Sequence, residues 1–221
     1  EANFISHFME PVDIPEEKQV RDYLPAVSLP QRFDTERPGY VCPTVTQKQF
    51  EAYRHQSQDA MDQAIEIIAD HDRTFGEHFG RSYGLLETVQ CDDAELVLVT
   101  TATITSTARV ALDELRNEGL RVGLCRLRVF RPFPVGAVRL ALDGIPKVAV
   151  LERNISIGRE GIFCSELKSA IVNCDRPPKV QGYLAGIGGT DVNPGLIKKV
   201  VHHALDAPGC IDGPIWMESD S

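Results

Sequence analysis

The sequence lacks the cysteine and histidine patterns that hold metal ions. Its six cysteines, at positions 42, 91, 125, 164, 174 and 210, are scattered and form no Cys-x-x-Cys pair. The histidines form no pair at the i, i+4 spacing of a helical metal site. Structural zinc and iron–sulfur clusters use closely spaced cysteines and histidines. We therefore expect no metal site in this chain, and we expect Cys125 and Cys164 to act as small apolar side chains.

Long apolar runs and an excess of positive charge are also missing. No stretch approaches the roughly 18 apolar residues of a membrane-spanning helix. Residues 1–15 have neither the basic start nor the apolar centre of a signal peptide. The net charge of −9 argues against binding to nucleic acid. These absences lead us to expect a cytoplasmic protein that binds neither a membrane nor nucleic acid.

Motifs for self-contained catalysis are absent as well. The sequence has no Gly-x-Ser-x-Gly nucleophile turn and no phosphate-binding Gly-Lys-Ser/Thr. Its stretch Gly186-Ile187-Gly188-Gly189-Thr190 departs from the dinucleotide-binding pattern Gly-x-Gly-x-x-Gly, because Asp191 occupies the position of the third glycine. The negative charge of Asp191 would also repel a pyrophosphate. We accordingly assign no catalytic, cofactor-binding or metal-binding residue.

Residues 1–45 are rich in proline and in large apolar side chains. The six prolines of this segment exclude a long helix or a central strand. The segment is nevertheless too apolar for a solvated tail. Its large apolar residues are Phe4, Ile5, Phe8, Val12, Ile14, Tyr23, Leu24, Val27, Leu29 and Phe33. We interpret residues 1–45 as an extended arm that packs on another domain or subunit.

Residues 46–90 are expected to form a helix and a loop that lead into the core. Thr46 and Gln49 have the spacing of a capping box, so the helix should begin there. Met61, Ala64 and Ile68 would share one face of this helix. We place its end at about Asp72 and expect a glycine-rich loop over residues 75–86.

Residues 91–207 alternate between strand and helix patterns. Leu96-Val97-Leu98-Val99 is an unbroken apolar run, as in a strand covered on both faces. Ala108, Ala111, Leu112 and Leu115 then repeat at helical spacing. Further strands are expected at 121–130, 147–151 and 179–185, and helices at 135–142, at 161–174 and from Pro194. This predicts an α/β domain with a three-layer, open and mostly parallel sheet. Residues 208–221 would be a tail in which Ile215 and Trp216 could dock.

The most suggestive polar residues lie at or just beyond the carboxyl ends of the predicted strands. Ligands of open α/β sheets bind beyond the carboxyl ends of the strands. The candidates at this edge are Arg126, Arg128, Arg131, Arg153 and Asn154. We expect these arginines to pair with Glu152, Glu160 or an acid of a neighbouring chain, or else to bind a small anion. The free N–H groups of the helix near residue 161 could also receive an anion, with Glu160 competing for them.

Several stretches recur together in one known family. They are Asp93-Ala94-Glu95-Leu96-Val97-Leu98-Val99, Phe130-Arg131-Pro132-Phe133-Pro134, Val148-Ala149-Val150-Leu151-Glu152-Arg153-Asn154-Ile155-Ser156 and Gly186-Ile187-Gly188-Gly189-Thr190-Asp191. In this order they resemble the transketolase C-terminal-like domain of the α subunit of 2-oxoacid:ferredoxin oxidoreductases, the pyruvate:ferredoxin oxidoreductase group. The segment from Ser6 to Pro25 is similar to the arm that joins the family's thiamine-binding domain to this one. One departure is that Ala102-Thr103 and Ser106 stand where the family usually has a Gly-Ser turn and another glycine four residues on.

The resemblance implies a component of an enzyme that converts a 2-oxoacid such as pyruvate to acyl-CoA and CO₂ while it reduces ferredoxin. It implies thiamine diphosphate, magnesium and 4Fe-4S clusters in partner subunits, with ferredoxin and coenzyme A as partners of the complex. It transfers no catalytic residue to this chain, and we expect the thiamine-binding domain to lie outside this sequence. The chain would serve assembly and support of the active site. The alternative is a non-catalytic module of the same fold that binds an anion or another protein.

Overall fold

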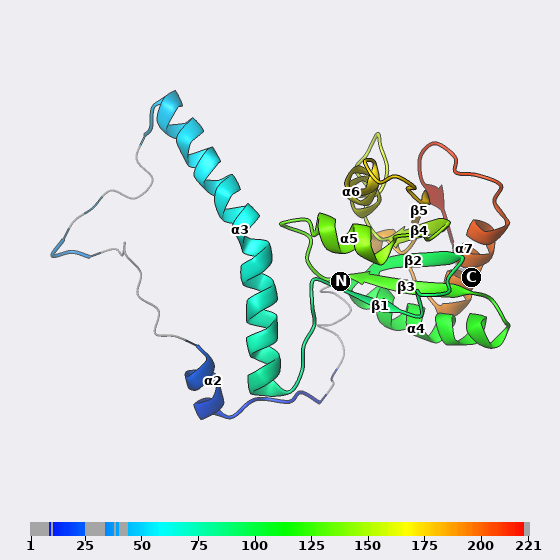
Figure 1. Ribbon diagram of the computed structural model, residues 1–221, viewed down its shortest axis with the longest axis horizontal. Coiled ribbons are helices and arrows are strands. Elements are labelled where there is room, and N and C mark those ends of the chain that lie inside the picture. The colour runs from blue at the N-terminus through cyan, green and yellow to red at the C-terminus, as the bar shows by residue number, and fades with distance from the viewer. Residues whose placement is uncertain (1–8, 10, 25–33, 38, 40–43, 219–221) are drawn as a thin grey trace. The chain divides into compact units, whose positions relative to one another are not determined.

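The computed structural model describes residues 9, 11–24, 34–37, 39 and 44–218, and the chain divides into two units. One unit comprises residues 10–82, and the other consists mainly of residues 83–221 (Figure 1).

The first unit contains two described helices, α2 (Glu17–Tyr23) and α3 (Gln47–Phe79). Glu17–Tyr23 is thus helical, whereas we expected an extended chain there. The apolar arm residues Phe4, Ile5, Phe8 and Phe33 lie outside the described residues.

Helix α3 begins where the sequence predicted and ends later. The capping box is present, because the Gln49 N–H donates to Thr46 Oγ1 at 3.3 Å and the Thr46 N–H donates to Gln49 Oε1 at 2.9 Å. The helix continues to Phe79, so the expected end at Asp72 and the loop from residue 75 are wrong. Phe75 and Phe79 pack around the Tyr23 ring, with centroids 5.7 and 5.4 Å from it. These contacts outweigh the roughly 1 kcal/mol that a glycine such as Gly76 costs inside a helix.

The second unit is built on a six-stranded sheet of order β1-β3-β2-β4-β5-β6. Only β1 is antiparallel to its neighbour. The strands are β1 (Leu86–Val89), β2 (Leu96–Thr101), β3 (Val122–Leu127), β4 (Lys147–Glu152), β5 (Lys179–Leu184) and β6 (Ile215–Trp216). The four central strands were predicted. The edge strand β1 was missed because four residues are too few to show a strand period, and β6 confirms that Ile215 and Trp216 dock.

Helices cover both faces of this sheet, which confirms the three-layer architecture (Figure 1). Along β2, Leu96 and Leu98 face one layer, whereas Val97 and Val99 face the other, as the two-residue period of a strand requires. The first layer contains α4 (Ala102–Asn117) and α7 (Pro194–Asp206), and the second contains α5 (Val135–Ala141) and α6 (Ile162–Ile171). A short 3₁₀ helix, η1 (Ile187–Gly189), follows β5.

The thiols of Cys125 and Cys164 are buried in the second layer, as predicted. Burial raises the pKa of each to about 12. None of the described helices is both long and apolar enough to cross a membrane.

The junction between β2 and α4 has a strained backbone. Ala102, the first residue of α4, has a φ of 48°, in the left-handed region that favours glycine. A non-glycine residue there costs about 1–2 kcal/mol. The family that the sequence resembles usually has glycine in this turn, so the alanine retains the turn at a cost in stability.

Replacing Ala102 with glycine should therefore stabilise the fold. We expect Ala102→Gly to raise the free energy of unfolding by about 1 kcal/mol, because relief of strain exceeds the added freedom of the unfolded chain. Ser106→Gly, at an exposed position of the same helix, is the control and should lower stability by roughly 0.5 kcal/mol. Thermal unfolding of both variants tests this, and a less stable Ala102→Gly variant would contradict the strain.

Candidate functional site

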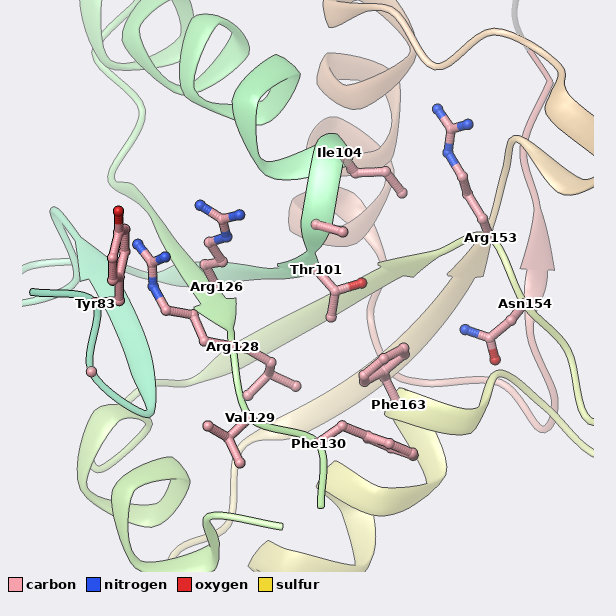
Figure 2. Close-up of a pocket in the computed structure, with 13 residues that line it drawn as sticks. Tyr83, Thr101, Ile104, Arg126, Arg128, Val129, Phe130, Arg153, Asn154 and Phe163 are labelled. Carbon is pink, nitrogen blue, oxygen red and sulfur yellow. The ribbon is translucent and has the colours of Figure 1, made fainter. Parts of the chain in front are cut away.

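A pocket of about 680 Å³ lies at the carboxyl edge of β2, β3 and β4 (Figure 2). Thr101 and Ala102 reach it from the β2–α4 junction, the segment from Arg126 to Phe130 from the end of β3, and Arg153 and Asn154 from the end of β4. This is the edge where ligands of open α/β sheets bind. Four of the five predicted candidates line the pocket, namely Arg126, Arg128, Arg153 and Asn154.

One carboxylate organises the arginines on the β3 side of the pocket. Glu87, on the edge strand β1, accepts hydrogen bonds from Arg109 Nη2 at 2.5 Å and from Arg128 Nη2 at 2.6 Å. The hydrogen bond from Arg109 lowers the pKa of Glu87, and the charge of Arg128 lowers it further. Because Arg109 lies on α4 and Arg128 follows β3, this carboxylate joins three elements.

Arg126 is left without a carboxylate of its own. Its Cα pairs with that of Glu87 in the β1–β3 register, yet it makes no hydrogen bond or ion pair with any described residue. Burial lowers the pKa of Arg126, and the charge of Arg128 lowers it further. The guanidinium groups of Arg109, Arg126 and Arg128 thus surround a single acid, Glu87, which leaves an excess of two positive charges.

Arg128 and Arg131 have partners within the chain. Arg128 pairs with Glu87 and lies over the Tyr83 ring, 5.1 Å from its centroid. Arg131 pairs with Glu166 on α6 and does not line the pocket. The expected pairing of these arginines with Glu152 or Glu160 is wrong, because those two acids serve the start of α6.

Glu152 fills the amino-terminal end of α6. Its carboxylate is 1% exposed and accepts hydrogen bonds from the backbone N–H groups of Phe163 and Cys164, both at 3.0 Å. Burial raises the pKa of Glu152, and these donors oppose the shift. The helix end that we expected to receive an anion is therefore occupied by a carboxylate of the chain itself. The competitor is Glu152 and not Glu160.

Glu160 has its own partners, since its carboxylate accepts from Lys168 Nζ at 2.6 Å and from Ser165 Oγ at 3.2 Å. Although burial acts to raise the pKa of Glu160, the hydrogen bond from Lys168 keeps it below its ordinary value. This acid therefore anchors the loop before α6 to the helix.

Asn154 and Arg153 extend from the loop that follows β4. The Asn154 amide donates to Glu152 Oε2 at 2.9 Å and accepts from the Ile162 N–H at 3.1 Å, so it joins the end of β4 to the start of α6. A Cβ at Gly186 would lie 2.9 Å from Arg153 Nε, so the Arg153 side chain lies against the loop after β5. Asn154 therefore shapes the pocket wall.

The sequence did not indicate two residues of this site, Glu87 and Arg109. Glu87 belongs to a strand that was not predicted, and its sequence signal would have been one acid within the short segment Leu86–Val89. Arg109 lies on helix α4, whose sequence pattern indicates only the apolar face that packs on the sheet. Among the described residues, no group of three or more histidine, cysteine, aspartate or glutamate side chains could hold a metal ion.

Removal of the Glu87 charge should destabilise the chain. Glu87→Gln leaves the three guanidinium groups without a counter-charge, and we expect a loss of about 1–2 kcal/mol in the free energy of unfolding. The matched variant Arg126→Met removes an uncompensated charge and should leave stability unchanged or raise it. Because the folded-state pKa of Glu87 lies below 4.5, its contribution is present above pH 4.5 and is lost as the pH falls through the lowered pKa. Chemical denaturation from pH 3 to 7 measures this, and a stable Glu87→Gln variant at pH 7 would contradict it.

Gly161 should tolerate no side chain. A Cβ at this position would lie 1.8 Å from Glu152 Oε1, so Gly161→Ala would displace the carboxylate that caps α6. We expect a loss of about 3 kcal/mol or more. Gly136→Ala is the control, because no atom lies within 4 Å of its added Cβ, and it should be neutral or stabilising. Equal unfolding temperatures for the two variants would refute the role of Glu152.

Comparisons with known proteins agree with the motif series. The family model for the pyruvate:ferredoxin oxidoreductase core domain II matches residues 94–197. Pyruvate synthase subunit PorA of Methanothermobacter thermautotrophicus is 36% identical over 197 residues, which are 89% of this chain and 50% of that protein. Ketoisovalerate oxidoreductase subunit VorA of Pyrococcus abyssi is 33% identical over 201 residues, covering 90% of this chain and 51% of that protein. The solved 2-oxoglutarate:ferredoxin oxidoreductase of Magnetococcus marinus aligns with a TM-score of 0.43 and 20% identity, over 62% of this chain and 23% of its own.

This chain spans about half the length of the two curated relatives, PorA and VorA. The two relatives are named as subunits of a pyruvate synthase and of a ketoisovalerate oxidoreductase, which implies further subunits in those enzymes. The core-domain match lies within the α/β unit, where the family's motif stretches occur in order. The chain belongs to the 2-oxoacid:ferredoxin oxidoreductase family, in which it corresponds to the region that carries core domain II.

Proposed function

We propose that this chain works as a component of an enzyme that oxidatively decarboxylates a 2-oxoacid, such as pyruvate, to an acyl-CoA and CO₂ and reduces ferredoxin. The observation that carries this proposal is the 36% identity to a pyruvate synthase subunit over 89% of the chain. The chain itself would provide assembly and support of the active site, and a cytoplasmic location stays a prediction.

We assign the cofactors to partner subunits. These cofactors would be thiamine diphosphate with magnesium and 4Fe-4S clusters, and coenzyme A and ferredoxin would bind the complex. In support, Cys125 and Cys164 are buried among apolar side chains of the described core, where they are not arranged as cluster ligands. The described residues of this chain therefore do not fit an iron–sulfur cluster, and no chemical step is assigned to them.

The carboxyl edge is the part of the chain that we expect to face the rest of the complex. Arg128, Arg131 and Asn154 are held by contacts within the chain and give this edge its shape. Arg126 would meet an anionic group from outside the chain, and Arg153 lines the same edge. Arginine suits such a contact, because its planar fork keeps its charge and binds a carboxylate or phosphate with two hydrogen bonds.

Helix α3 supports a place in a larger assembly. None of its described residues is buried. Four of its large apolar side chains are about half exposed, namely Phe50, Tyr53, Met61 and Ile67. A soluble protein that works alone seldom leaves so many large apolar groups in water along one helix. We propose that α3 and the arm pack on other subunits.

Purification of the native complex through an affinity tag on this chain tests the proposed function. We expect a brown preparation that contains other subunits, thiamine diphosphate, iron and sulfide, and that reduces ferredoxin with a 2-oxoacid only when coenzyme A is added. The isolated chain should be colourless and inactive. A cluster absorption band near roughly 400 nm in the pure chain would contradict the assignment of the clusters to partners.

The alternative is a non-catalytic anion-binding or assembly module, which the unpaired Arg126 favours. The same purification distinguishes the two functions, because a lone colourless species from the native source would refute the oxidoreductase component.

A further inference from the structure

The pocket at the carboxyl edge carries more positive charge than the described chain neutralises. We propose that this pocket binds a phosphate monoester whose organic part is apolar or aromatic, with Arg126 as the main contact to the phosphate. The inference goes beyond the proposed function, because it rests on the pocket alone and does not depend on the complex that the chain joins.

The net charge of the arginine cluster favours a ligand with two negative charges. Arg109, Arg126 and Arg128 surround the single carboxylate of Glu87, whose oxygens already accept hydrogen bonds from Arg109 and Arg128. The cluster therefore keeps an excess of two positive charges. A carboxylate would neutralise one of them, whereas a phosphate monoester above its second pKa of roughly 6 carries about two negative charges.

The available donors lie where such a group can reach them. Figure 2 shows Arg126 and Arg128 together on the β3 side of the pocket, which Thr101 also lines. Arg128 Nη2 donates a hydrogen bond to Glu87, whereas Arg128 Nε is buried and has no acceptor among the described residues. A buried N–H without an acceptor costs about 1–3 kcal/mol. An anion in the pocket that accepts from Arg126 would give that guanidinium group the acceptor that the described residues do not supply.

The end of α4 adds to the positive potential. Thr101 precedes this 16-residue helix without a side-chain cap, and no acid occupies its first turn. By contrast, Glu152 fills the corresponding end of α6. The positive end of the α4 dipole therefore lies at the pocket without a described carboxylate to offset it.

The opposite wall is apolar and too large for inorganic phosphate alone. Phe130 and Phe163 pack with their ring centroids 4.8 Å apart and line the pocket (Figure 2). The volume of about 680 Å³ lies in the usual range for an organic ligand. A phosphate at Arg126 would leave its apolar substituent to pack against these two rings.

Calorimetric titration of the full 221-residue chain with three probes tests the inference. The probes are phenyl phosphate, inorganic phosphate and benzoate, at constant ionic strength. We expect phenyl phosphate to bind most tightly at pH 7.5, because only this probe combines the dianion with a ring. Absence of saturable binding of phenyl phosphate at millimolar concentrations would overturn the proposal.

Variants locate the site. Arg126→Ala should weaken phenyl phosphate binding by about tenfold or more, as expected for one charge-assisted contact, and Arg126→Lys should restore part of it. The matched control is Arg121→Ala. Arg121 is an exposed arginine that pairs with Glu95, and it lies just before β3, at the end of the strand away from the pocket. Phe130→Leu should weaken binding of phenyl phosphate but not of inorganic phosphate. Circular dichroism establishes that each variant folds, and full affinity in a folded Arg126→Ala variant would overturn the assignment.

The pH profile identifies the charge of the bound group. The affinity for phenyl phosphate should rise between pH 5 and 7, as the dianion forms with a second pKa of roughly 6. The charged side chains around the pocket do not produce this rise. Guanidinium groups keep their charge, and the pKa of Glu87 lies below 4.5. Burial raises the pKa of Glu152, which bonds Asn154 at the pocket wall, but ionisation of this carboxyl group would weaken the binding of an anion. Benzoate bound as tightly as phenyl phosphate throughout this range would show that the pocket takes a carboxylate, such as an acidic side chain of a partner, and would refute the phosphate ligand.

Discussion

The carboxyl edge of the sheet depends on one ion pair network centred on Glu87. This acid lies on a four-residue edge strand and bonds an arginine of α4 and an arginine that follows β3. Through these contacts, β1 and α4 are held against the end of β3, where the pocket opens. The network also leaves Arg126 next to like charges, and no described acid pairs with it. The same interaction therefore shapes the pocket and makes it a site for an anion.

A second carboxylate, that of Glu152, determines which helix end at this edge is free to attract an anion. Glu152 turns inward from the end of β4 and caps α6, where Gly161 leaves room for it. That end of α6 is thereby neutralised within the chain. Among the described residues, no carboxylate caps the start of α4, whose first residue, Ala102, has a left-handed backbone. The edge thus consists of one neutralised helix end and one open, positive helix end.

The sequence predicted most of the core and part of the site, for physical reasons. Buried parallel strands such as β2 leave unbroken apolar runs, and helices such as α4 leave a clear helical period, so both were found. Strand β1 was missed because its pairing with β3 is a long-range contact that four residues cannot encode locally. The partner of Arg128 was missed with it, since Glu87 lies on that strand. The extension of α3 to Phe79 was missed because packing against Tyr23 maintains the helix beyond its glycine.

We have proposed that this chain is a subunit of a larger oxidoreductase and that the pocket at its carboxyl edge binds a phosphate monoester. An experimental structure of the complex purified through this chain tests both together. We expect partner subunits around the chain and a phosphate group within hydrogen-bonding distance of Arg126, with the attached organic group against Phe130 and Phe163. A pocket filled by an acidic side chain of a partner, or an Arg126 guanidinium that contacts only water in a pocket without ligand, would contradict this expectation.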